Sequence, residues 1–319
     1  MAFIATIVTG RRIALNTGRN LSDSDTLGTS PPRQSVPLKT IFTQRSTVSS
    51  LSNTARLSAT LSPSPKSISF SHLTAAHTQI PATDILWISP PLRIGYSVAG
   101  RPIEVYRFGI GKTERMIVAG VHGGYEWNTI ALADELINYF WAHPEAIPIN
   151  TRLYILRALN PDGEIRSHSF DGRANDNGVD INRNFPTYWQ ATWPREGCWD
   201  QRPITAGEFA ASEPETMALI NFIEAHPIDA LLSYHSAALG IFPGGRPPDA
   251  ASIDLAETIA AVSSYPYPPI DLGCLMTGQM ADWASINDIA AVDVELSNHK
   301  DTDFEQNLVI ISAFLNWQR

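Results

Sequence analysis

The sequence lacks any run of about 18 apolar residues, the length that a helix needs to cross a membrane. It also has little positive charge, since 23 Lys and Arg stand against 32 Asp and Glu, for a formal net charge of −9. No basic stripe is present, so we expect no nucleic-acid partner. Its two cysteines, Cys198 and Cys274, fit neither a CxxC pair nor a zinc finger. They form one disulfide or remain free thiols. The sequence does not indicate the oligomeric state.

The N-terminal part differs in composition from the rest. Residues 1–92 contain 8 Lys and Arg against 3 Asp and Glu, whereas the remaining residues contain 15 against 29. Stretches such as Ser-Thr-Val-Ser-Ser at 46–50 cannot bury enough apolar surface to offset the entropy of ordering. We therefore expect residues 1–85 to be a low-complexity, disordered segment and residues 86–319 to be a catalytic domain. The first arginines follow the apolar start, which is not the order of a secretory signal.

From about residue 94 the pattern becomes regular, with apolar runs of strand length alternating with helical periodicity. A loop-rich stretch at 160–205 interrupts it, and two capping boxes, Ser212 with Glu215 and Thr302 with Glu305, mark helix starts. The pattern predicts strands at 103–109, 115–121, 152–158, 229–235 and 289–296, and helices at 126–141, 212–225, 250–263, 278–286 and 302–317. Such alternation is typical of a largely parallel sheet covered by helices on both faces.

Two histidines follow apolar strands. His122 ends the strand at 115–121, Glu126 begins the next helix, and two glycines between them allow a tight turn. His235 ends the strand at 229–235. Either histidine alone is typical of a packed core residue, but two His with one Glu form the ligand set of catalytic zinc sites, which leave one position open for water.

Two further segments, the loop at 160–185 and the strand end at Glu295, carry polar residues that are either structural or functional. The loop contains Asn-Pro-Asp-Gly at 160–163, Arg173 and Asn-Arg-Asn-Phe at 182–185. Asx turns explain it, but an arginine fork also binds a carboxylate or a developing oxyanion. Similarly, Glu295 is either an exposed residue at a strand end or a functional carboxylate.

In this order, the motifs resemble the zinc carboxypeptidases, over roughly residues 94–317. The string Gly-Val-Asp-Ile-Asn-Arg-Asn-Phe at 178–185 and Ser-Tyr-His-Ser at 233–236 are the most specific. Gly-Tyr-Ser-Val-Ala-Gly-Arg-Pro at 95–102 looks like the family's entry to its first strand. The resemblance implies a three-layer α/β/α sandwich around a mixed, largely parallel sheet of about eight strands.

The resemblance also implies the roles of individual residues. His122, Glu126 and His235 would hold one Zn²⁺ per chain. Glu295 would act as general base on the attacking water and return the proton to the leaving amine. Arg173 would polarise the scissile carbonyl. The two residues implied to bind the terminal carboxylate of the substrate are Asn182 and Arg183.

The sequence departs from the family pattern at three places, one of which is a loose match around Asp282, where the resemblance implies the specificity pocket. The family usually has His-x-x-Glu, whereas one more residue separates His122 from Glu126. The digestive members carry a mobile Tyr eight to nine residues before an Asp-Trp pair, but here that count from Asp282 reaches Cys274. Tyr265 and Tyr267 lie too far upstream, so we assign no catalytic Tyr.

The glycine-rich turn and the short spacing from Arg173 to Asn182 look more like the bacterial murein peptide amidases. A wall-derived peptide with a diaminopimelate-type residue is therefore one expected substrate, and ordinary C-terminal trimming of peptides is equally compatible. Wall peptidases are often exported, which favours an extracytoplasmic location. The alternatives are a zinc-dependent deacylase of N-acyl amino acids, which needs a smaller closed pocket, and a non-catalytic carboxylate-binding module, which should lack the base or a ligand.

Overall fold

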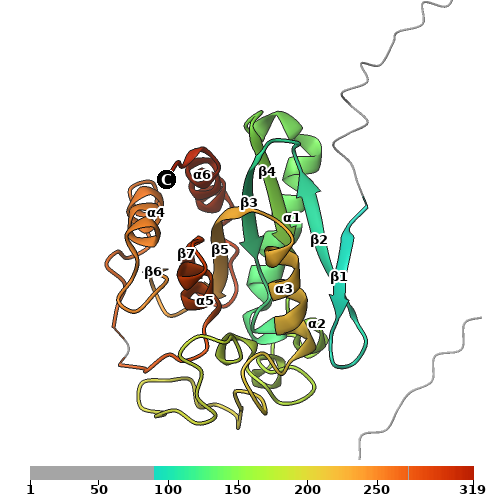
Figure 1. Ribbon diagram of the computed structural model, residues 1–319, viewed down its shortest axis with the longest axis vertical. Helices are drawn as coiled ribbons and strands as arrows, with labels where there is room; N and C mark the ends of the chain where they lie inside the picture. The colour runs from blue at the N-terminus through green and yellow to red at the C-terminus, as the bar shows by residue number, and fades with distance from the viewer. Residues whose placement is uncertain (1–89, 272) are drawn as a thin grey trace, which may run out of the picture. The chain divides into compact units, whose positions relative to one another are not determined.

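A computed structural model describes residues 90–271 and 273–319 (Figure 1). The predicted disordered segment 1–85 lies outside the described residues. Within the described part the chain forms one sheet of seven strands, in the order β1-β2-β4-β3-β5-β7-β6. The sheet is mixed and largely parallel, as expected, and has seven strands where about eight were expected. Two of the seven were not predicted by hydrophobic periodicity, β1 (Leu92–Tyr96) and the three-residue β6 (Ile241–Pro243).

The four central strands are parallel. They are β4 (Thr151–Leu156), β3 (Thr113–Val118), β5 (Ile228–Ser236) and β7 (Ala290–Leu296). At the edges, β1 pairs with β2 (Pro102–Phe108), β2 with β4, and β6 with β7, all antiparallel. The carboxyl ends of β3 and β5 therefore lie side by side, where the loops drawn in yellow-green gather in Figure 1.

Helices cover both faces of the sheet, as predicted. One face packs apolar residues against α1 (Trp127–Ala142), α4 (Ala250–Ala260) and α6 (Phe304–Asn316). The other packs against α3 (Pro214–Glu224) and α5 (Met280–Ile286). The side chains of successive strand residues point to opposite faces. In β7, Val292 and Val294 consequently join the first face, while Asp293 and Glu295 point to the face of α3 and α5.

Both predicted capping boxes are wrong. Helix α3 begins at Pro214 with Glu213 as N-cap and no side-chain cap, and Glu215 instead accepts hydrogen bonds from Val98 N and Asn175 Nδ2. Helix α6 begins after Asp303, and the Thr302 hydroxyl donates to Glu135. In both cases a distant partner replaces the local bond that the spacing predicted. None of the helices in the described residues is long and apolar enough to cross a membrane.

Candidate metal centre and active site

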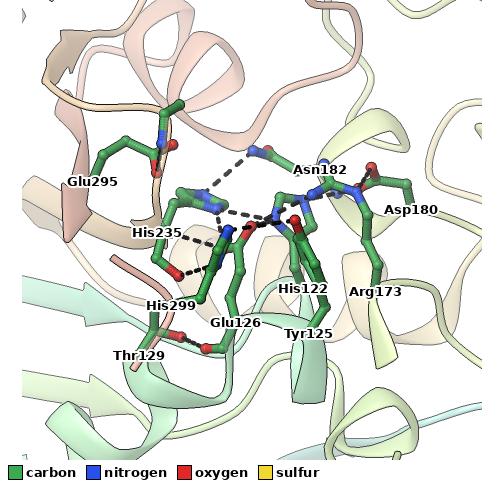
Figure 2. A network of polar contacts seen from close by, with 12 residues as sticks. His122, Tyr125, Glu126, Thr129, Arg173, Asp180, Asn182, His235, Glu295 and His299 are labelled. Atoms are coloured by element: carbon green, nitrogen blue, oxygen red, sulfur yellow. Dashed lines mark hydrogen bonds and ion pairs between the residues drawn. The ribbon is translucent and has the colours of Figure 1, made fainter. Parts of the chain in front are cut away.

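The three predicted ligands meet at the carboxyl ends of β3 and β5. His122 follows β3, Glu126 ends a 3-10 turn at Gly123–Glu126, and His235 is the next-to-last residue of β5. His122 Nδ1 lies 2.7 Å from Glu126 Oε1, and His235 Nδ1 lies 3.2 Å from both His122 Nδ1 and Glu126 Oε2 (Figure 2). One ligand atom from each residue lies within 4.8 Å of the others, and all three residues are buried.

The extra residue between His122 and Glu126 does not separate them, because the 3-10 turn brings both side chains inward. Gly123 has a φ of +45°, and a Cβ there would lie 2.7 Å from Gly163 Cα. A Cβ on Gly124 would lie 2.5 Å from Ser167 Cα. The turn thus needs two glycines for conformation and for close approach of the neighbouring backbone.

The outer ring nitrogens of both histidines are also held. His122 Nε2 lies 3.1 Å from Asp180 Oδ1, and His235 Nε2 lies 2.8 Å from the Ser233 hydroxyl. These contacts leave both Nδ1 atoms facing the Glu126 carboxylate. Two imidazoles and a carboxylate, each oriented by a second residue, fit a zinc ion with an open position. Asp180 was missed as an orienting residue, although it lies inside the diagnostic string at 178–185.

Charges in this cluster keep its carboxylates ionised. Burial alone would raise the pKa of Glu126, but His122 and His235 hold it well below its usual range. Burial opposes ionisation of Asp180 too, and Arg173 and His122 lower its pKa. A divalent cation binds ionised carboxylates, so Glu126 suits a ligand and Asp180 suits a partner of the ligand His122.

Arg173 reaches the metal cluster from the loop. Its Nε donates to Asp180 Oδ2 at 2.9 Å, and one Nη lies 3.4 Å from Glu126 Oε1. The guanidinium carbon lies 5.0 Å from the centre of the Trp199 ring and 5.9 Å from that of Tyr125. Cation–π contacts on two sides hold the group close to the ligands.

Asn182 and Arg183 line the same cavity as Arg173. The Asn182 amide accepts from Met280 N at 2.9 Å and lies 3.4 Å from His235 Nε2. Arg183 is buried, its Nη1 donates to its neighbour's carbonyl oxygen, and its Nε has no hydrogen-bond partner in the described part of the chain. Burial lowers the pKa of Arg183 to about 10, even though Asp180 opposes this.

Glu295 faces the cluster from the end of β7. One carboxylate oxygen accepts from Ala238 N at 2.9 Å (Figure 2). Burial raises the pKa of Glu295 to about 7, with a further contribution from Glu126 and against the effect of His235. This carboxylate is therefore poised between its two protonation states near neutral pH.

One cavity of about 760 Å³ is lined by the three metal ligands together with Arg173, Asn182, Arg183 and Glu295. Cys198 and Cys274 both line it and form a disulfide, with their Cα atoms 4.7 Å apart, which decides the alternative that the sequence left open. Tyr125 lines the cavity, and its hydroxyl lies 3.4 Å from His299 Nε2. The lining residues that the functional sequence pattern did not indicate include Tyr125, Trp199, Asp293 and His299.

Known proteins are similar to this chain in sequence. Murein peptide amidase A of Vibrio campbellii is 26% identical over 249 residues, which cover 74% of this chain and 92% of that protein. Carboxypeptidase A1 of Mus musculus is 28% identical over 228 residues, covering 60% of this chain, and the chain spans about half (53%) of that relative's length.

Solved structures show the same fold. The murein-tripeptide amidase of Escherichia coli O157 aligns with a TM-score of 0.53 at 22% identity, covering 75% of this chain and 97% of that one. Bovine thrombin-activatable fibrinolysis inhibitor, solved with a tick carboxypeptidase inhibitor, aligns with a TM-score of 0.58 at 20% identity, covering 71% and 88%. The zinc carboxypeptidase (peptidase M14) family model matches residues 88–309. With the His122–Glu126–His235 cluster in place, the chain belongs to the zinc carboxypeptidase family.

Proposed function

We propose that this protein hydrolyses an amide bond next to a free carboxylate, at the C-terminal residue of a peptide. The observation that supports this most directly is Arg183, a buried guanidinium that lines the cavity and whose Nε has no hydrogen-bond partner among the described residues. A buried charge without a full set of partners is costly, and a substrate carboxylate would supply the partner that Nε lacks. Asn182 is the second group for that carboxylate.

The remaining residues divide the chemistry. His122, Glu126 and His235 would hold a zinc ion, which would supply a Lewis acid and lower the pKa of the attacking water. Glu295, with its pKa raised to about 7, accepts the proton of that water and delivers it to the leaving amine. Arg173 polarises the scissile carbonyl and stabilises the negative charge that develops on its oxygen. Asp180 keeps both His122 and Arg173 in position.

For the substrate, we favour a peptide derived from the bacterial cell wall. Support comes from the murein amidase relative, because the chain matches 92% of that protein's length. A deacylase of N-acyl amino acids needs a small closed pocket, whereas this cavity measures about 760 Å³. A non-catalytic binding module should lack a ligand or the base, and here all four residues are present.

The experiment is zinc content and peptide hydrolysis on the full chain, with Glu295→Gln beside the wild type. We expect one zinc per chain in both proteins and hydrolysis only in the wild type, because glutamine keeps the shape but cannot take the proton. Glu224→Gln, on the exposed side of α3, is the matched control and should keep both properties. Zinc binding without cleavage of any C-terminal or wall peptide would instead support the deacylase or the binding module.

A further inference from the structure

Asp293 is a second carboxylate on the cavity side of β7, and the mechanism does not use it. It stands two residues before Glu295 on the same face of the strand, so it lies roughly 7 Å further into the sheet. Its neighbours across the sheet are Ser233 of β5 and Phe242 of β6. It therefore lines the same cavity as Glu295 from a position further along the strand toward the middle of the sheet.

Few contacts within the protein compensate this carboxylate. Asp293 is 6% exposed, and its Oδ1 has no hydrogen-bond partner among the described residues. The nearest cationic group is His235 Nε2 at 3.7 Å, and the Ser233 hydroxyl, which lies 2.8 Å from that nitrogen, interacts with both groups. Asp282, in the same cavity, differs, since it accepts from Gly245 N at 2.9 Å and pairs with Arg246 Nε at 3.0 Å. A buried carboxylate without a matched partner is costly unless a ligand provides one.

The other site residues determine which part of a substrate reaches Asp293. With the terminal carboxylate on Arg183 and the scissile amide beside Glu295, the side chain of the terminal residue extends along the remaining cavity wall. Asp293, Asp282 and Arg246 are charged residues that line this cavity. Arg246 pairs with Asp282, whereas the ion-pair partner of Asp293 is only the His235 ring, 3.7 Å away.

We propose that Asp293 is a specificity-determining residue, which binds an ammonium group on the side chain of the residue that the enzyme releases. This inference rests on the proposed function and names its substrate class, a C-terminal residue with a basic or zwitterionic side chain. Lysine and diaminopimelic acid both carry such a group. For the zwitterionic side chain, Arg246 is the nearby cation that can meet the second carboxylate.

The test compares substrates that differ only in this ammonium group. The first pair of peptides ends in lysine or in norleucine, and the second is γ-glutamyl-diaminopimelate against γ-glutamyl-2-aminopimelate. We expect the wild type to prefer the ammonium-bearing member of at least one pair by roughly 10- to 100-fold in kcat/KM, the range for one hydrogen bond to a charged group. In Asp293→Asn this ratio should fall to about one, with zinc content unchanged. Asp282→Asn removes the same charge from the same cavity and should retain the ratio.

Three results would overturn parts of this reasoning, and they can be told apart. Equal or faster cleavage of norleucine and 2-aminopimelate peptides by the wild type refutes the role of Asp293 and leaves the proposed function standing. Loss of zinc in Asp293→Asn shows that the residue orients His235 instead of selecting the substrate. No cleavage of any of the four peptides by the zinc-loaded wild type refutes the proposed function itself.

Discussion

Replacing Asp180 with asparagine should weaken zinc binding without changing any ligand. The Asp180 carboxylate accepts from His122 Nε2 at 3.1 Å, from Arg173 Nε at 2.9 Å and from Asn182 N at 3.0 Å. Asparagine has the same shape, but its NH₂ group must face one of these donors. One hydrogen bond between charged or polarised groups is lost, which costs about 1.5–3 kcal/mol of folding free energy at this fully buried position.

Zinc affinity should fall by about 10- to 100-fold, because His122 loses the carboxylate that fixes its ring and increases its basicity. Competition with a chelator measures this, and Asp176→Asn, which removes a partly exposed carboxylate paired with Arg166, is the control. The pH dependence of the unfolding free energy of the zinc-free proteins is a second measurement. Since the folded pKa of Asp180 is lowered, its stabilisation is complete above the unfolded value of about 3.9 and disappears as pH falls through the folded pKa. An Asp180→Asn protein with unchanged zinc affinity would refute the orienting role.

Three other outcomes follow from the same geometry. The ratio kcat/KM should rise with pH as Glu295 loses its proton, with a midpoint at or below about 7, since a bound cation can only lower that pKa; a flat acidic limb would exclude this base. Gly123→Ala should lower zinc affinity, and it should lower the unfolding free energy by more than the roughly 1–2 kcal/mol that a left-handed backbone costs alanine by itself. Gly100→Ala measures that backbone cost alone, because a Cβ at Gly100 meets nothing within 4 Å. Replacing Cys198 and Cys274, which lie 76 residues apart, with serine should lower the unfolding free energy in urea by about 2–4 kcal/mol, and an unchanged value would show that the disulfide is dispensable.

The parts of the fold that sequence predicted are those where local pattern and tertiary packing agree. The central strands have near-continuous apolar residues, as strands covered on both faces must. His122 follows the end of β3, and His235 lies in the last two residues of β5. The edges were harder to predict. Strand β6 has three residues and is defined by its pairing with β7, so no periodicity can reveal it.

Distant contacts explain the remaining errors. Glu215 accepts hydrogen bonds from Val98 and Asn175 instead of capping its own helix, and no pattern around residue 215 predicts these partners. Asp180 lay in a recognised motif, but only the folded loop shows that it serves both His122 and Arg173. Asp293 reads as one more residue in an apolar strand until the cavity beside it is seen.

The pairing of β3 with β5 has a consequence for how the chain folds. His122 and His235 are 113 residues apart in sequence, so a complete site for the metal forms only once these two strands lie together. Contacts of such long range close late and slowly during folding. Zinc therefore binds the native state in preference to the unfolded chain, and each tenfold increase in free zinc above its dissociation constant adds about 1.4 kcal/mol to the stability. The ion that the active site requires also acts as a thermodynamic clamp on the centre of the sheet.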